Sequence, residues 1–143
     1  MNYYLVNQNK TYNEEVRGEY MWAPILDKVG KKQYHWEAMK GIKDGDLVLN
    51  YCDRKISSYC ITKGSYYNQE NPFKGEELWR KDGRMVDCSY SHLSTPLMVD
   101  DHIEKLLELQ EEKYGPFAKD RRIKQGYLFS LNSDLVDYMK ECS

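Results

Sequence analysis

The chain has 143 residues, a length typical of one domain with one hydrophobic core, so we expect residues 1–143 to form a single domain. Hydrophobic residues make up 41% of the chain and charged residues 31%, which excludes general disorder and a fibrous repeat. Lysine and arginine number 21 against 23 for aspartate and glutamate; the formal charge of -2 excludes a global cationic surface, so a nucleic-acid partner would have to bind a local basic patch.

The first third of the chain predicts short strands around one helix. Residues 3–6 are apolar and β-prone and predict a first strand, which leads into a polar loop. Residues 19–23 are predicted as an exposed loop that carries Trp22. The helical spacing of Trp36 and the apolar residues after it predicts a short helix over 34–42.

The middle of the chain predicts two hairpins. Residues 43–51 combine an Asp-Gly turn with an alternating apolar strand, which is predicted to pair with a second strand in residues 55–63. Residues 68–75 are polar and predict a surface loop. Two further β-like pieces, 77–79 and 85–90, predict a hairpin whose turn is the Asp-Gly pair between them.

The last third predicts two helices and one strand. A helix is expected over residues 101–113, with Asp101 as its N-terminal cap. Residues 126–131 predict a final strand, after which Asn132 or Ser133 caps a short last helix. This order lacks strict alternation of strands and helices, so it favours an α+β class with a small, partly closed mixed β-barrel flanked by two to three short helices.

The cysteines and the N-terminus indicate the compartment. The opening residues lack a basic segment followed by a long apolar stretch, and no apolar run reaches the ~18 residues that a membrane span requires. The cysteines also lack the spacing of a zinc site. We therefore expect a cytoplasmic protein with reduced thiols, no metal ion, no cofactor and no membrane partner.

Catalytic motifs are missing from the sequence, whereas aromatic and basic residues stand out. The three histidines, of which His35 beside Trp36 is the least ordinary, lie in no motif of a hydrolase, a phosphate-binding loop or a metalloprotease, so we expect no catalytic residue in this chain. Tyrosine and tryptophan number 13 and 3 against 3 phenylalanines, which suits a pocket that stacks a planar ligand. Two basic clusters are candidates for contact with a nucleic-acid backbone: Lys31 and Lys32, and Lys119, Arg121, Arg122 and Lys124.

An ordered series of motifs resembles a known family. Trp22-Ala23-Pro24, then Trp36-Glu37-Ala38-Met39, then the strand Lys43-Asp44-Gly45-Asp46-Leu47-Val48-Leu49-Asn50-Tyr51 resemble the EVE domain. This domain belongs to the PUA-like superfamily with the YTH and ASCH domains. The resemblance runs from residue 3 to about residue 96, with 126–131 as the closing strand. EVE domains open with a Trp-containing strand, where this chain has Tyr3 and Tyr4.

The resemblance implies a reader of modified nucleic acid. It implies a PUA-like fold without enzymatic activity that flips a modified base, methylated cytosine in DNA before RNA, into an aromatic cage. Such a reader acts as the specificity module of a modification-dependent restriction system, with a nuclease or GTPase domain or subunit as its partner. The implied base-binding residues are the aromatic Trp22, Trp36 and Tyr51, with Tyr20 and Trp79 as further candidates, and the polar Asn7 and Asp46.

Other interpretations remain open at this point. Trp36 fits a core anchor as well as a pocket wall, and Asp46 fits a turn-capping carboxylate better than a reader of a base. An ASCH-like or other PUA-like RNA binder or ribonuclease would use His35 or Tyr51. A protein-interaction domain would use its aromatic residues only to fill the core. A cavity bordered by Trp22 favours the reader over this last alternative.

Overall fold

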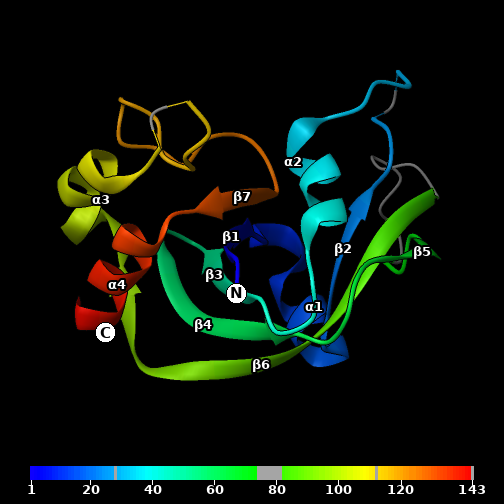
Figure 1. Cartoon of the computed structure of the whole chain (residues 1–143), viewed down its shortest axis with the longest axis horizontal. Helices are drawn as coiled ribbons and strands as arrows, with labels where there is room; N and C mark the ends of the chain where they lie inside the picture. Colours follow the sequence, from blue (N-terminus) through cyan, green and yellow to red (C-terminus); the bar gives the residue numbers. More distant parts are fainter. Residues whose placement is uncertain (28, 74–81, 112, 143) are drawn as a thin grey trace.

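One curled mixed sheet organises the molecule. The computed structural model describes residues 1–27, 29–73, 82–111 and 113–142. The described strands run in the order β2-β6-β4-β3-β1-β7, with β5 paired to β6. Figure 1 shows that this sheet curls into a half-barrel with short helices around it. The strand bounds are β1 Tyr3–Asn7, β2 Tyr20–Pro24, β3 Leu47–Cys52, β4 Lys55–Thr62, β5 Tyr67–Glu70, β6 Asp82–Met98 and β7 Leu128–Leu131.

The helices are short and follow the ends of the strands. The 3-10 helix η1 and the helix α1 follow β1, α2 and η2 precede β3, and α4 follows β7. The bounds are η1 Asn9–Thr11, α1 Tyr12–Gly18, α2 Tyr34–Glu37, η2 Ala38–Gly41, η3 Val99–His102, α3 Ile103–Leu109 and α4 Ser133–Cys142. This mixture of a curled sheet and short helices confirms the α+β class. No helix in the described parts of the chain is long and apolar enough to cross a membrane.

Strand β1 is an interior strand of the sheet, between β3 and the edge strand β7, and has apolar side chains on both faces. It pairs in parallel with β3, Leu5 opposite Leu49, and antiparallel with β7. Val6 packs in a core cluster on one face with residues of β2, β3 and η2. Leu5 packs on the other face against residues of α3, β7 and α4. Because successive side chains of a strand point to opposite faces, β1 contributes to both halves of the core and its end is held rigidly.

Several sequence predictions are confirmed. The first strand, the helix that begins at residue 34 and the final strand form as predicted. The β3–β4 hairpin turns tightly, with Asp53 and Arg54 at φ values of 52° and 65°. The last helix is capped by Asn132, whose Oδ1 accepts the backbone N–H of Leu135 at 2.9 Å.

The sequence predicts a polar loop directly after the first strand and indicates no helix before residue 18, whereas the structure has two helices there. These helices are η1 and α1, and the one fully buried side chain of α1 is the carboxylic acid Glu15. A helix whose inward-facing side chain is acidic lacks the apolar stripe by which a helix is predicted from sequence. The pattern of the sequence therefore could not indicate this helix.

The structure also corrects the predictions for the segment around Trp22, for the Asp82-Gly83 turn and for the helix cap near residue 101. Trp22 lies in β2 and not in an exposed loop. Asp82 and Gly83 lie in β6, where they pair with β5, so they do not form the predicted turn, and residues 91–95 continue the same strand. The cap of the helix near residue 101 makes no side-chain hydrogen bond. The predicted strand at 77–79 lies outside the described residues.

Candidate functional site

A cavity of about 350 Å³ opens where β1 ends. Its walls come from four parts of the chain that are distant in sequence: residues 7–11 after β1, Trp22 and Pro24 of β2, His35 and Trp36 of α2, and residues 125–127 before β7. This volume is at the lower end of the range of about 300–1,000 Å³ that is usual for small-molecule pockets. The mixture of aromatic rings and amide groups in the walls suits a planar polar ligand.

The structure brings three of the predicted base-binding residues together in this cavity. Asn7, Trp22 and Trp36 all line it. Tyr51 and Asp46 do not, and Tyr20 packs beside Trp22 and Phe73 away from the opening. Trp79 lies outside the described residues. The cavity also contains polar residues that sequence reasoning did not select.

Trp22 is a packed side chain rather than a free cage wall. It is only 1% exposed, and its ring meets Phe73 edge-on at a centroid distance of 5.7 Å. The ring lies directly against Gly83, where a Cβ atom would overlap with it. Its Nε1 donates to the backbone oxygen of Gln69 at 2.9 Å. These contacts are the structural reason for a tryptophan here, which the expectation of an exposed loop did not include.

Trp36 is the aromatic ring best placed to meet a ligand. It is half-buried on α2 and packs edge-on against His35 at a centroid distance of 5.2 Å. The helix is attached to the sheet by an ion pair between Glu37 and Arg84, whose Oε2 and Nη1 atoms are 2.6 Å apart. Arg84 is 7% exposed, so this pair lies in a partly dry environment where it orients the helix.

Two of the predicted residues have structural roles elsewhere. The carboxylate of Asp46 accepts the backbone N–H groups of Asn2 at 2.9 Å and Lys43 at 2.8 Å, so it caps a turn, as the alternative interpretation expected. The ring of Tyr51 is buried in the core cluster between the sheet and α4. Both side chains therefore stabilise the fold, and neither lines the cavity.

A buried carboxylate lies beneath the cavity. Glu15 is 0% exposed and accepts hydrogen bonds from Thr11 Oγ1 at 2.5 Å, from Gln8 Nε2 at 3.2 Å and from the Tyr127 hydroxyl. The backbone N–H of Trp22 donates to it at 3.3 Å. Burial raises the pKa of Glu15 to about 7, although these donors favour its ionised form.

Two amide oxygens of the cavity residues are unusual. Asn7 Oδ1 and Gln8 Oε1 are buried, and neither has a hydrogen-bond partner in the described parts of the chain. Buried polar atoms without a partner are rare in folded proteins and call for an explanation, such as a ligand that supplies the partner. Gln8 lies within a polar run that the sequence alone identifies only as a loop, so no pattern could have pointed to it.

His35 has a defined protonation state in the wall. Its Nδ1 accepts the backbone N–H of Tyr127 at 3.0 Å, which leaves the proton of the neutral ring on Nε2. Burial lowers the pKa of His35 below its usual value. The ring is therefore neutral near pH 7 and supplies a hydrogen-bond donor next to Trp36.

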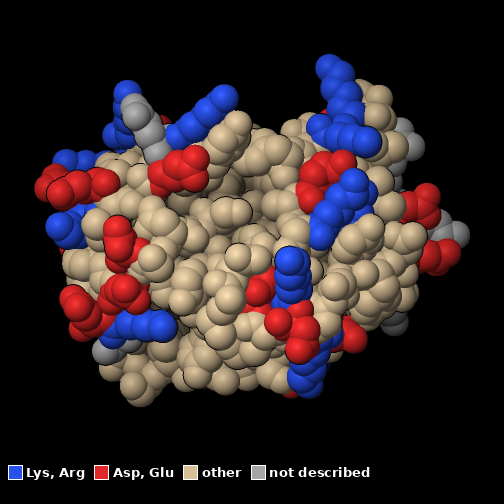
Figure 2. All heavy atoms as spheres, viewed as in Figure 1, with Lys and Arg blue, Asp and Glu red and all other residues tan. Residues whose placement is uncertain are grey.

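Exposed basic residues lie on two segments that flank one edge of the molecule. Figure 1 shows the segment before α2 and the segment between α3 and β7 rising at the same edge. In the same view, Figure 2 shows lysine and arginine side chains on two projections with a hollow of mostly uncharged surface between them. The predicted basic residues of these segments are exposed or half-exposed: Lys31, Lys32, Lys119, Arg121, Arg122 and Lys124. Within the described residues, no group of three or more potential metal ligands gathers.

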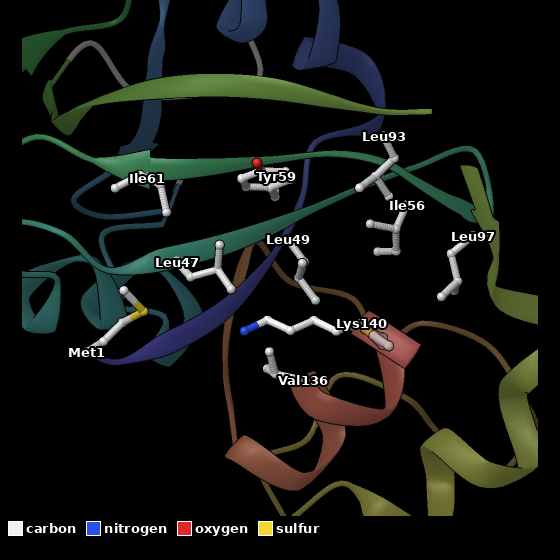
Figure 3. Close-up of a pocket in the computed structure, with 11 residues that line it drawn as sticks. Met1, Leu47, Leu49, Ile56, Tyr59, Ile61, Leu93, Leu97, Val136 and Lys140 are labelled. Carbon is white, nitrogen blue, oxygen red and sulfur yellow. The ribbon is translucent and has the colours of Figure 1, made fainter. Parts of the chain in front are cut away.

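A second cavity lies between the sheet and the last helix. It has a volume of about 400 Å³ and is bordered by β3, β4 and α4. Figure 3 shows that Leu47, Leu49 and Val136 line it, with the side chain of Lys140 lying across it. Its lining is almost entirely apolar, so it offers few directional hydrogen bonds. The first cavity is the better candidate for specific recognition.

Comparisons with known proteins identify the fold but not a function. No protein-family model matches the sequence, and no curated protein matches it. The structure is similar to that of a hypothetical protein from Leishmania major, with a TM-score of 0.61 and 13% identity over 99% of this chain and 94% of that one. It is similar to a protein from Pseudomonas putida, with a TM-score of 0.62 and 11% identity over 97% of both chains. A protein from Pseudomonas syringae has a TM-score of 0.61 and 10% identity over 98% of both chains.

Proposed function

We propose that this chain is a PUA-like domain of the EVE type that binds a modified base, methylated cytosine in DNA first among them, after flipping it into the cavity at the end of β1. The observation that carries the proposal is the meeting of Trp36, Trp22 and Asn7 in one cavity. A flipped base presents a flat surface and a polar edge, and stacking on one aromatic ring contributes about 1–3 kcal/mol. The ring of Trp36 supplies the stacking surface, and Asn7 supplies a polar group.

The distribution of charge supports a nucleic-acid ligand. The net charge of the chain is -2, yet exposed lysines and arginines cluster on the two segments that flank the edge in Figure 2. Residues of one segment, 125–127, and Lys10 belong to the walls of the cavity itself. Phosphate groups on both sides of a flipped nucleotide would meet these basic side chains. A nuclease partner would supply cleavage in such a restriction system, and a GTPase is the other partner that the resemblance implies.

An RNA-binding or RNA-cleaving domain is the second candidate, and one observation favours it. His35 lines the cavity as a neutral ring with its proton on Nε2, and this N–H group can donate a hydrogen bond to an oxygen atom of a bound RNA strand. Tyr51, the other residue expected for this function, is buried away from the cavity. The two candidates differ in turnover: a reader leaves every substrate intact.

The proposal is tested by binding to matched duplexes. Wild-type protein is titrated against fluorescent DNA that carries one 5-methylcytosine and against the same unmodified DNA. We expect tighter binding to the methylated duplex, and we expect Trp36→Ala to weaken that binding by at least about tenfold, since a stacking surface is lost. Duplexes with 5-hydroxymethylcytosine and N6-methyladenine, and the corresponding RNA, complete the panel.

A neighbouring aromatic residue provides the control. Tyr34 lies on the same helix, is 52% exposed and does not line the cavity, so Tyr34→Ala should bind like the wild type. Equal affinity of the wild type for every modified and unmodified duplex contradicts the reader. Cleavage of RNA that is lost in His35→Ala supports the second candidate instead.

A further inference from the structure

Gln8 is the residue that most restricts what the cavity can bind. It lines the cavity and is only 2% exposed. Its Nε2 group donates to Glu15 Oε2 at 3.2 Å and to the Tyr90 hydroxyl at 2.8 Å. Its backbone N–H donates to the oxygen of Tyr51 at 3.0 Å, and its backbone oxygen accepts from the N–H of Thr11 at 2.6 Å. Oε1 is thus the single polar atom of Gln8 that has no partner in the described part of the chain.

The orientation of the Gln8 amide is set by its two partners. The Tyr90 hydroxyl donates its only proton to the backbone oxygen of Tyr20 at 2.8 Å, so it can only accept from Gln8. The ionised carboxylate of Glu15 also only accepts. Turning the amide over would place its oxygen against two acceptors, which is unfavourable. Gln8 therefore keeps its NH₂ group on the buried network and has an oxygen as its unsatisfied atom.

Asn7 adds a second buried amide oxygen without a partner, at the same end of β1. Two such acceptors are unfavourable in an empty cavity and are satisfied by a ligand that supplies N–H donors. Cytosine and adenine carry an exocyclic amino group, which is a donor, whereas thymine has a carbonyl oxygen at the corresponding position. A carbonyl at this position would face the amide oxygen of Gln8 and leave that acceptor unpaired.

We propose that Gln8, held by Glu15, makes the cavity selective for bases that carry an exocyclic amino group over bases that carry a carbonyl oxygen there. Gln8 accepts the hydrogen bond from the base. Glu15 is a positioning residue, which acts on the selectivity through Gln8. This inference rests on the proposed function, because it concerns a base bound in the same cavity.

Protonation of Glu15 removes one of the two constraints on the Gln8 amide. The pKa of this carboxyl is raised to about 7 by burial. The titratable groups that face Glu15 all have raised pKa values and stay neutral near pH 7: the hydroxyls of Tyr20, Tyr90 and Tyr127 and the thiol of Cys88. A further charged group near this cluster is Glu14, whose negative charge contributes to the raised pKa of Tyr20. A protonated Glu15 can donate to the Gln8 oxygen, so the amide can turn and the selectivity is lost as the pH falls.

The test compares two bases that share a methyl group and differ in the edge that Gln8 would read. Affinity is measured for a duplex with 5-methylcytosine opposite guanine and for the same duplex with thymine opposite guanine. The mismatched thymine is easier to flip, so a preference for 5-methylcytosine must come from the cavity. We expect at least about tenfold tighter binding of 5-methylcytosine at about pH 8.5, and a preference below about threefold at about pH 6. If the binding panel shows that this protein prefers N6-methyladenine, the same comparison is made between N6-methyladenine and hypoxanthine.

Three variants separate the roles of the residues. Gln8→Met should keep Trp36-dependent binding and lose most of the preference for the amino group. Glu15→Gln cannot ionise, so its preference should be low and the same at both pH values. Glu14→Gln changes an exposed carboxylate on the same helix and should keep the preference and the pH profile of the wild type.

Each outcome decides between the inference and the function on which it rests. Trp36-dependent binding with equal affinity for the two bases at about pH 8.5 overturns the selection by Gln8 and leaves the reader function standing. Failure of every modified duplex to bind in a Trp36-dependent way overturns both. If circular dichroism shows that Glu15→Gln is unfolded, the wild-type pH profile decides, and a preference that is constant with pH overturns the role of Glu15.

Discussion

At the scale of single residues, the buried Glu15 is the most consequential side chain of this protein. An ionised carboxylate without access to water is costly, and here four hydrogen-bond donors offset part of that cost. The same donors include Gln8 and Tyr127, which line the cavity. The charge of one residue therefore determines both the stability of α1 and the direction of the hydrogen bonds beneath the cavity.

This burial predicts a pH-dependent stability. The pKa of Glu15 is raised from 4.5 to about 7 in the folded protein, so the folded state holds a proton that the unfolded state releases. The resulting stabilisation is complete below about pH 4.5 and is lost as the pH rises through about 7, with a size on the order of 3 kcal/mol. Urea denaturation of the wild type and Glu15→Gln over this range measures it. We expect the difference between their free energies of unfolding to change with pH.

Glu14 again provides the matched control for this measurement. It precedes Glu15 on α1 and is exposed, so the free energy of unfolding of Glu14→Gln should follow that of the wild type at every pH. Parallel curves for the wild type and Glu15→Gln would show that Glu15 does not titrate differently in the two states.

At the scale of elements, the position of α2 determines the aromatic wall. The helix has only four residues, Tyr34–Glu37, which is too short to be stable by itself. It depends on contacts with the rest of the protein, among which the ion pair of Glu37 with the nearly buried Arg84 of β6 is the shortest, at 2.6 Å. Lys32 and Lys40 lie 3.9 Å and 3.7 Å from the other oxygen of Glu37 and are more exposed.

Removal of this ion pair should destabilise the attachment of α2, and with it the position of Trp36. We expect Arg84→Met to lower the free energy of unfolding by about 1–3 kcal/mol, because Glu37 loses its buried partner, and to weaken the binding of the modified duplex. The control is Arg121→Met: Arg121 forms an equally short bond with Glu104, but both side chains are mostly exposed, so its loss should cost less than about 0.5 kcal/mol. Thermal denaturation compares the stability of the two variants, and duplex titration measures the binding of Arg84→Met. Equal losses of stability in the two variants would contradict this role of Arg84.

At the scale of the whole molecule, the curl of the sheet brings distant segments to one edge. Residues 31–32 and 119–124 are far apart in sequence, and the folded chain places their segments at the same edge in Figure 1. A chain with a net charge of -2 has no general attraction for nucleic acid, so binding depends on this local arrangement.

The binding of DNA should therefore depend on salt in a way that specific residues control. Lys31→Gln together with Lys32→Gln should weaken binding to methylated and unmodified duplexes by similar factors, and should lower the slope of affinity against salt by up to about 2. Lys63→Gln, an exposed lysine outside both segments, should leave the slope unchanged. Titrations at several salt concentrations measure the slope. If the double variant at Lys31 and Lys32 leaves the slope unchanged, residues 31–32 do not belong to the interface.

The sequence and the structure agree where a pattern of side chains has a local cause. The alternation of β3 and the helical spacing around Trp36 come from the requirement to bury apolar side chains, and both elements form as predicted. The pattern is misleading at α1, where the buried side chain is acidic, and at Trp22, where a strand reads as a loop. Asn7 and Trp36 were selected from the sequence, whereas Gln8, Glu15 and Tyr127 were not, because their roles depend on partners more than 80 residues away or on the burial of a charge.

The order of residues by itself determined the class of fold and the interior strands, since apolar periodicity and turn chemistry are local properties. The tertiary structure alone decided that Trp22 is packed, that the ring of Tyr51 does not line the cavity, and that a carboxylate lies beneath the cavity. Local patterns cannot carry this information, because a cavity exists only where segments from different parts of the chain meet, and the energy of a buried polar group depends on all of its neighbours at once.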